Sequence, residues 1–212
     1  MSTLPETMIV TAGTETATYI KQEVCEPTEL TVIQPMAAYS QRDERWKDFE
    51  YAPGYTLGRS GCLLTAIAMI GSFYYDGIIT PLTVAQTLKD QGGFNKGELV
   101  LPEYVQCCYD RLHFAGRADW RDGPADMDLL REELRLFDAT IILVHGNPSS
   151  GESVDKHTHF VVLRLIYGNE AEIVDPLDGQ PKQLLSSTYA LAGWDLARAI
   201  YGVRQFRITR DD

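Results

Sequence analysis

Two nearly uninterrupted apolar runs in the second half of the chain constrain its fold most strongly. Residues 139–144 and 160–166 consist almost wholly of aliphatic and β-branched side chains, a composition typical of strands whose two faces are both covered by other elements. Residues 171–174 follow the second run after a short Gly-Asn loop, which indicates a hairpin. Residues 201–208 predict one more strand. The second half of the chain therefore predicts an antiparallel sheet.

The first half of the chain predicts helices. Thr80 and Pro81 are residue types favoured at an N-cap and at the first position of a helix, and Gly92-Gly93 is a stop signal. Asp126 is a second candidate N-cap. The four predicted helices cover residues 62–75, 81–91, 101–111 and 127–137. Helices followed by an antiparallel sheet place the chain in the α+β class.

The chain divides into a short N-terminal extension and one folded domain. A single domain is expected for 212 residues of which 44% are hydrophobic. Residues 1–36 are rich in Thr and Glu, and prolines interrupt their two β-prone runs, 8–10 and 30–33. We interpret residues 1–36 as an extension that docks the protein or binds a partner, and residues 37–212 as the folded domain.

Charge and composition narrow the range of partners and locations. The 19 Lys and Arg against 30 Asp and Glu give a net charge of −11, and without a basic run the chain is not expected to bind nucleic acid. The N-terminus lacks the basic and apolar regions of a Sec signal peptide. The uncharged stretch at residues 60–75 is too short for a membrane span. We expect a cytoplasmic protein or a component of a larger particle.

One of the four cysteines has a sequence context typical of a reactive thiol. The cysteines are Cys25, Cys62, Cys107 and Cys108, and their spacing indicates reduced thiols rather than a disulfide framework. Cys62 follows Ser60-Gly61 at the predicted start of an apolar helix. Unpaired backbone N–H groups and the helix dipole at such a position can lower the pKa of a thiol from about 8.5 to about 3.5–7.5. An ordinary buried cysteine is the alternative interpretation.

A nucleophilic cysteine needs a base and a group that orients the base. His159 lies at the start of the 160–166 run, and Asp175 lies at the end of the 171–174 run. The predicted hairpin brings these two residues to the same edge of the sheet. The sequence therefore predicts a His159–Asp175 pair that serves Cys62.

The length of the hairpin loop decides whether the two side chains share a face of the sheet. A two-residue loop would place Asp175 opposite Val162, which points away from His159. A three-residue loop at residues 167–169 would place Asp175 opposite Val161, on the face of His159 and diagonal to it. We therefore expect the three-residue loop.

Two other histidines compete with His159 for the role of base. His157 lies two residues earlier, and His145 ends the preceding predicted strand. Each of the three could instead be a hydrogen-bonded structural histidine. A metal site built from His145, Asp155, His157 and His159 is a further alternative, but neither a helical HExxH motif nor a paired Cys-x-x-Cys motif supports it.

Four segments of the chain carry a family resemblance. They are Tyr39-Ser40-Gln41-Arg42-Asp43-Glu44-Arg45-Trp46, Leu57-Gly58-Arg59-Ser60-Gly61-Cys62 with Thr65-Ala66-Ile67-Ala68-Met69, His159-Phe160-Val161-Val162, and Asp175-Pro176. Their order of Gln, Cys, His and Asp resembles that of the C39-like family of papain-fold cysteine peptidases, over roughly residues 38–208. The resemblance implies a papain-like fold, with N-terminal helices packed on a C-terminal antiparallel sheet.

The resemblance also implies roles for individual residues. The implied roles are nucleophile for Cys62, general base for His159, orienting residue for Asp175, side-chain donor to the oxyanion hole for Gln41, and scaffold for Asp43, Arg45 and Trp46. The implied reaction is hydrolysis of peptide or amide bonds through a thioester, with no cofactor and no metal. The implied substrate is a protein or the peptide stems of bacterial cell walls.

Two other functions stay open at this point. One is a catalytically silent, peptidase-like assembly module, for example in a phage or secretion particle, that docks through residues 1–36. The other is a transferase or deamidase that uses the same fold and the same thioester. An intact set of the four implied catalytic residues favours an enzyme over the silent module.

Overall fold

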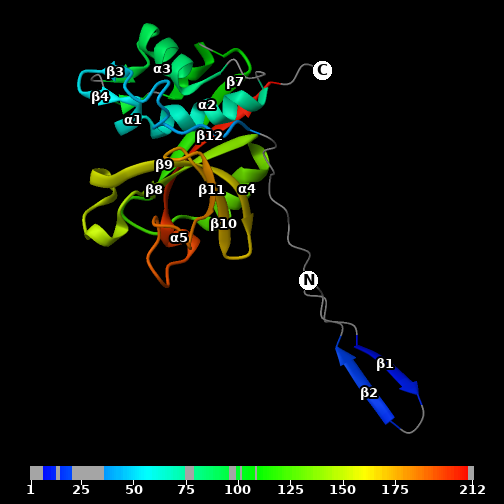
Figure 1. Ribbon diagram of the computed structural model, residues 1–212. Helices are drawn as coiled ribbons and strands as arrows, with labels where there is room; N and C mark the ends of the chain where they lie inside the picture. Colours follow the sequence, from blue (N-terminus) through cyan, green and yellow to red (C-terminus); the bar gives the residue numbers. More distant parts are fainter. Residues whose placement is uncertain are drawn as a thin grey trace.

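The computed structural model describes residues 7–12, 15–20, 36–74, 79–95, 99, 100, 102–107 and 109–209. Its largest sheet has six strands in the order β11-β10-β9-β8-β12-β7, and all neighbouring strands run antiparallel (Figure 1). The strands are β7 (Leu112–Asp119), β8 (Ala139–His145), β9 (Thr158–Tyr167), β10 (Glu170–Asp175), β11 (Gln180–Gln183) and β12 (Ile200–Ile208). With the helices below, this sheet confirms the α+β class.

Helices and small hairpins complete the described part of the chain. The α-helices are α1 (Leu57–Ser60), α2 (Cys62–Tyr74), α3 (Pro81–Asp90), α4 (Met127–Leu136) and α5 (Leu196–Ala199). The 3₁₀ helices are η1 (Pro102–Cys107), η2 (Pro148–Ser150) and η3 (Val154–His157). The hairpins are β1–β2 (Thr7–Ala12, Glu15–Ile20), β3–β4 (Glu50–Ala52, Tyr55–Thr56) and β5–β6 (Phe94–Asn95, Leu99–Val100). Within the described ranges, no helix has the length and apolarity needed to cross a bilayer.

Local capping chemistry sets two of the predicted helix starts. Thr80 accepts the backbone N–H of Thr83 at 3.2 Å, and the Thr83 hydroxyl accepts the backbone N–H of Thr80 at 2.8 Å, which forms a capping box for α3. Asp126 accepts two N–H groups from the first turn of α4, at 3.1 and 3.0 Å. The predicted helix at residues 101–111 is wrong, because the chain forms only the short η1 before it enters β7 and pairs with β12.

The sheet has two edge strands that the sequence pattern did not predict. In β7, burial alternates only weakly along the strand and Gly116 interrupts the side-chain pattern. In β11, only four residues pair, and Pro181 is one of them. The β-prone run at residues 8–10 lies in β1, whereas the run at 30–33 lies outside the described residues. The docking role of residues 1–36 stays a prediction.

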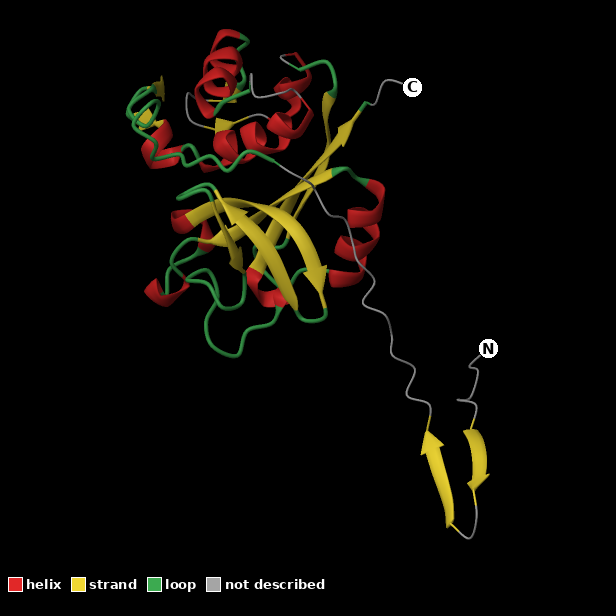
Figure 2. Ribbon diagram, turned by 45° about the vertical axis from the view of Figure 1, so that its right-hand side comes forward, coloured by secondary structure: helices red, strands yellow, loops and turns green. Residues whose placement is uncertain are grey.

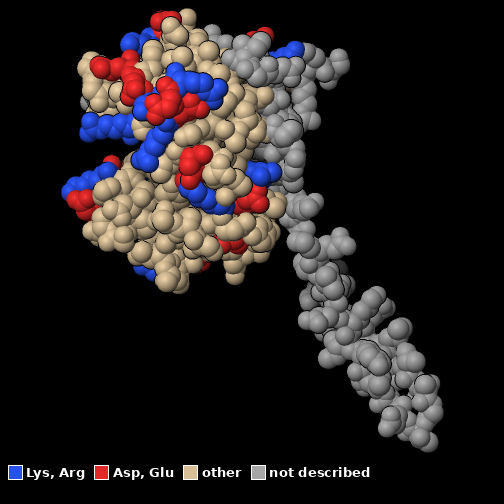
Figure 3. All heavy atoms as spheres, viewed as in Figure 1, with Lys and Arg blue, Asp and Glu red and all other residues tan. Residues whose placement is uncertain are grey.

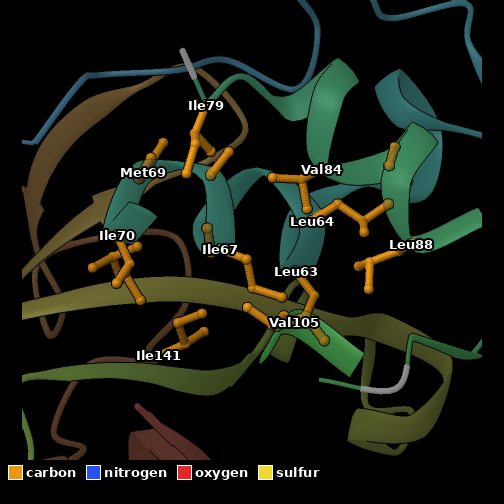
Figure 4. Packing of buried hydrophobic residues seen from close by; sticks show 14 of the residues in the cluster. Leu63, Leu64, Ile67, Met69, Ile70, Ile79, Val84, Leu88, Val105 and Ile141 are labelled. Atoms are coloured by element: carbon orange, nitrogen blue, oxygen red, sulfur yellow. The ribbon is translucent and has the colours of Figure 1, made fainter. Parts of the chain in front are cut away.

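Both faces of the central strands are covered, as the apolar runs predict. Ile141 packs against α2 in one hydrophobic cluster (Figure 4). Val162 belongs to the same cluster. Ile142 and Val161, their neighbours in the sequence, belong to a second cluster that includes Leu130 of α4. In Figure 2, α4 lies beside the strands while the other large helices gather at their upper end. Consecutive side chains of one strand therefore enter different cores, which explains why the runs contain almost no polar residue.

We expect a buried leucine of α2 to contribute strongly to stability. Leu64 of α2 is fully buried, so Leu64→Ala should lower the free energy of unfolding by about 2–5 kcal/mol through lost contacts and a residual cavity. Chemical denaturation followed by circular dichroism measures this change. Leu129→Ala, at a leucine that is 39% exposed, is the matched control and should cost much less; equal losses would contradict the assigned packing.

Candidate active site

Cys62 occupies the first position of α2, and Gly61 joins it to α1. A Cβ at position 61 would lie 2.4 Å from the carbonyl oxygen of Leu57, so only glycine fits this tight connection. The Gly61 carbonyl accepts the N–H of Thr65 at 2.8 Å, which starts the hydrogen bonding of α2. The thiol of Cys62 is half-buried. The predicted placement of this cysteine at a helix start is confirmed.

His159 and Asp175 come from neighbouring strands and form a direct hydrogen bond. Nε2 of His159, on β9, lies 2.8 Å from Oδ1 of Asp175 at the end of β10. His159 is 8% exposed and Asp175 is completely buried. A buried carboxylate at this distance fixes the orientation of the imidazole ring.

The register that brings this pair together differs from the one we expected. The turn has two residues, because Tyr167 pairs with Glu170, so the predicted three-residue loop is wrong. A β-bulge then shifts the pairing by one residue: Glu172 lies opposite Leu165, whereas the next residue of β10 lies opposite Leu163. The bulge supplies the extra residue that we had assigned to the loop. It therefore restores the register in which Asp175 and His159 share a face.

The His159 side chain also interacts with the Cys62 thiol. The Cys62 and His159 side chains act on each other through hydrogen bonding and charge, which lower the pKa of the thiol and raise that of the imidazole. Because Nε2 is engaged by Asp175, Nδ1 is the ring nitrogen that is left to interact with the thiol. The His159 ring thus lies between Cys62, at the start of α2, and Asp175, at the end of β10.

Hydrogen bonds and the attraction between opposite charges favour a thiolate–imidazolium pair, and they outweigh the opposing effect of burial. Burial alone would raise the pKa of the Cys62 thiol, but the His159 hydrogen bond and charge, with backbone hydrogen bonds from Phe160 and Leu63, bring it below its ordinary value. Burial alone would lower the pKa of His159, but its hydrogen bonds to Asp175 and Cys62 raise it to about 9. Both shifts favour the charged forms near neutral pH.

Asp175 has further partners that sequence reasoning missed. Its Oδ1 also accepts the backbone N–H of Leu177 at 2.9 Å, while its Oδ2 accepts hydrogen bonds from the Tyr189 hydroxyl and the Lys182 ammonium group. Burial opposes ionisation, but these donors and the His159 charge hold the pKa of Asp175 well below its usual range.

A sequence signal for Lys182 did exist. Asp178-Gly179 is a favoured hairpin sequence, and Gly179 has a φ of 73° in the structure; the loop itself spans residues 176–179, because Asp175 pairs with Gln180. That hairpin pairs Lys182 with Ile173, which places Lys182 diagonally across from Asp175. Tyr189 lies in an irregular segment and had no comparable signal.

Gln41 links the two parts of the site. Its backbone N–H donates to the carbonyl of Pro176 at 2.7 Å, and its Nε2 donates to the carbonyl of Gly58, in α1, at 3.0 Å. The side chain is 3% exposed, and its Oε1 has no partner among the described residues. An amide carries two N–H donors, so one remains after the bond to Gly58. Gln41 thus lies between the segment that follows Asp175 and the helix that precedes Cys62.

The residues beside Gln41 form a scaffold. Trp46 is 4% exposed and its indole N–H donates to the carbonyl of Ser40 at 2.8 Å. The Arg45 guanidinium lies 4.4 Å from the centre of the Trp46 ring and pairs with Asp43 at 2.7 Å. These contacts fix the turn that carries Gln41, in agreement with the predicted structural role.

The two competing histidines make contacts outside the Cys62 pair. His145 uses both ring nitrogens, one toward the carbonyl of Glu152 at 2.8 Å and one as acceptor for the N–H of Asn147 at 3.0 Å. His157 meets the carboxylate of Glu152 at 2.6 Å. Asp155 pairs with an arginine instead. Among the described residues, no group of three or more His, Cys, Asp or Glu side chains could hold a metal ion.

The surface has an indentation near α1 and the strands β8 and β9. On the face drawn in Figure 3, an indentation at the left margin separates the surface over α1 from the surface over the ends of β8 and β9. Lys and Arg side chains gather along its upper rim.

The chain was also compared with known proteins. Searches of family models, of curated proteins and of solved structures found no match for the chain. The chemistry of the site is therefore argued from its own residues. A cysteine hydrogen-bonded to a histidine, which is itself bonded to a buried carboxylate, is an arrangement able to carry out nucleophilic attack and proton transfer.

The Cys62–His159 pair should be visible in the pH dependence of alkylation. Because the pKa of Cys62 is lowered and that of His159 is raised to about 9, the reactive thiolate should persist below pH 8 and be lost only on acidification through the thiol pKa. We expect His159→Ala to slow iodoacetamide labelling of Cys62 at pH 6 by about tenfold or more, since each unit of pKa is a factor of ten in thiolate.

Mass spectrometry of the labelled peptides measures this rate and compares it with the other three cysteines. His113→Ala is the matched control, since its imidazole hydrogen-bonds to the Thr209 hydroxyl at 2.9 Å and has no part in the proposed site. Faster labelling of Cys25, Cys107 or Cys108 than of Cys62 at pH 6 would rule out Cys62 as the activated thiol.

Proposed function

We propose that the protein is a cysteine peptidase that resembles the C39-like, papain-fold family and hydrolyses peptide or amide bonds. The observation that carries the proposal is the position of the His159 ring, which hydrogen-bonds to Asp175 on one side and to Cys62 on the other. Gln41, Cys62, His159 and Asp175 follow the family's order along the chain. A helix-start cysteine facing a histidine on an antiparallel sheet supports the papain-like fold.

The proposed reaction begins with formation of a thioester. The Cys62 sulfur attacks the carbonyl carbon of the substrate and forms a C–S bond, which places negative charge on the carbonyl oxygen. As the C–N bond breaks, His159 passes its Nδ1 proton to the leaving amine. The products of this half-reaction are a free amine, an acyl-thioester on Cys62 and a neutral imidazole.

Hydrolysis of the thioester completes the cycle. Neutral His159 removes a proton from water as the water oxygen attacks the thioester carbonyl carbon. The C–S bond then breaks, and Cys62 leaves as a thiolate beside the protonated His159. Asp175 keeps its negative charge throughout, because its low pKa leaves it unprotonated at neutral pH.

Gln41 and the first turn of α2 supply the proposed oxyanion hole. The N–H of Gln41 that does not bond to Gly58 and the backbone N–H of Cys62 would donate to the oxygen of the tetrahedral intermediate. The bond to Gly58 holds the Gln41 amide in place before substrate arrives. Such preorganised donors need no rearrangement as the charge develops.

Turnover by active-site variants tests the proposal. We expect Cys62→Ala and His159→Ala to reduce hydrolysis by about 1,000-fold or more, while Asp175→Asn should lose less because its side chain can still orient the ring. The substrates are a peptide library and purified peptidoglycan, with release of new amines as the measurement. His157→Ala, two residues from His159, is the matched control and should keep activity.

The same experiment decides between the open functions. Amine release with a water-derived carboxylate supports a hydrolase, whereas release of amine with transfer of the acyl group to an added amine supports the transferase. A wild-type protein that cleaves neither substrate pool, yet captures a partner only when residues 1–36 are present, would overturn the peptidase in favour of the assembly module.

The role of Gln41 has a separate signature. Gln41→Ala should lower kcat by about 100- to 1,000-fold, the usual cost of one oxyanion donor. Alkylation of Cys62 at pH 6 should stay near the wild-type rate, because Gln41 makes no described contact with the thiol or the imidazole. A parallel loss of turnover and alkylation would instead indicate that Gln41 only supports the fold.

A further inference from the structure

Asp175 is held by more donors than an orienting carboxylate needs. One oxygen, Oδ1, meets His159 and the backbone N–H of Leu177. The second oxygen, Oδ2, receives the Tyr189 hydroxyl and the Lys182 ammonium group. Each carboxylate oxygen of Asp175 therefore accepts two hydrogen bonds, and these bonds hold the carboxylate in its orientation toward His159.

Tyr189 packs beside the His159–Asp175 hydrogen bond. It is 3% exposed, and its ring centre lies 5.0 Å from that of His159 at an interplanar angle of 36°. Burial and the neighbouring Asp175 charge raise the pKa of Tyr189 well above its ordinary value. Its hydroxyl therefore stays protonated near neutral pH and donates to Asp175, and its buried ring keeps water from the bond.

Lys182 places a positive charge next to the same carboxylate. Its ammonium group contacts Asp175 and lies 2.8 Å from the exposed carboxylate of Asp178. Its side chain is 28% exposed, so solvent screens the charge only in part. The pKa of Lys182 is raised by these carboxylates despite partial burial, which keeps the ammonium group charged.

With these contacts, the two negative and two positive charges at the centre of the site sum to zero. Cys62 and Asp175 are negative, whereas His159 and Lys182 are positive; the exposed Asp178 is the remaining charged group described in contact with them. Without Lys182 the inner set would carry a net negative charge. The proton of His159 would then be held more tightly, and a negative charge on Cys62 would be less favourable.

We propose that Lys182 and Tyr189 are positioning residues of the peptidase site: Tyr189 fixes and shields the Asp175–His159 pair, and Lys182 limits the pull of Asp175 on the imidazolium. This inference rests on the proposed function, because it assigns these residues a part in the Cys62 reaction. Its chemical reason is that His159 must release its proton to the leaving amine. An imidazolium paired with an unbalanced carboxylate is a weaker acid and releases that proton more slowly.

The pH profile of Cys62 alkylation tests the role of Lys182 without the need for a substrate. Lys182→Met should move the acid limb of the profile upward by about half to one pH unit, because a nearby positive charge that favours the thiolate is lost. Titration of the His159 ring by NMR should show its pKa moving in the same direction. Lys182→Arg keeps the charge and should restore the wild-type profile.

Two further variants distinguish a specific effect of the Lys182 charge from a general loss of structure. Lys156→Met removes a surface lysine that pairs with Glu152 and should leave the profile unchanged. Asp178→Asn removes the exposed charge that opposes Lys182, and it should shift both pKa values downward by a smaller amount. The opposite sign of this shift keeps the proposal testable even if Lys182→Met fails to fold.

Tyr189→Phe tests the second positioning residue. Loss of its hydroxyl leaves Oδ2 with one donor fewer, so the pKa of His159 should rise and kcat should fall by about tenfold with little change in KM. Tyr167→Phe is the control, since Tyr167 is 40% exposed and its hydroxyl meets Gln183 instead. A Tyr189→Phe protein with the wild-type His159 titration and kcat would overturn the role of Tyr189.

The outcomes separate this inference from the proposed function. A wild-type Cys62 that alkylates only with the profile of an ordinary thiol would overturn the activated cysteine and this proposal with it. A wild-type profile with a lowered thiol pKa that neither Lys182→Met nor Asp178→Asn moves would overturn the role of Lys182 alone. Shifts of opposite sign in these two variants, with rescue by Lys182→Arg, would support it.

Discussion

The antiparallel ladder of β8, β9 and β10, buried on both faces, is the constraint on which the rest of the structure depends. Ile141 and Ile142 enter different hydrophobic clusters, as do Val161 and Val162. A one-residue slip of any of these strands would move each side chain into the wrong core. The ends of β9 and β10 are therefore held in fixed positions, and these ends carry His159 and Asp175.

A second constraint is electrostatic. A buried carboxylate is costly unless charges or hydrogen-bond donors compensate for the lost water. Asp175, fully buried, meets this requirement with four donors from three side chains and one backbone N–H. Lys182, on the edge strand β11, and Tyr189, in the irregular segment that follows, supply two of these donors. The same contacts that make the carboxylate tolerable also fix the direction of the His159 ring.

The candidate site joins elements that are distant in the sequence. Gln41 connects the turn after Asp175 to α1 through one backbone and one side-chain hydrogen bond. Glycine at position 61 then allows α1 to pass directly into α2, which presents Cys62 at its first position. These short-range devices set the position of the thiol relative to the strand that carries His159. The proposed chemistry depends on their combined geometry and on no single motif.

The sequence by itself determined the elements whose signal is local or strongly periodic. Apolar runs predicted the central strands, and capping residues such as Thr80 predicted helix starts, because burial on two faces and unpaired N–H groups each demand particular residue types. Helix-start chemistry predicted the position of Cys62. The hairpin predicted the His159–Asp175 pair, although through a loop length that the structure does not have, and the need of a nucleophile for a base joined Cys62 to that pair. The edge strands β7 and β11 escaped prediction, because edges are only partly buried and place weaker demands on composition.

Only the tertiary structure decided the register and the surroundings of the site. The expected three-residue loop is replaced by a two-residue turn and a bulge, two solutions that bring Asp175 to the same face and that no local signal distinguishes. Packing of both cores selects between them, since it acts on every residue of β9 and β10 together. Lys182 and Tyr189 reach Asp175 for the same reason: their positions depend on how distant segments close around one buried charge.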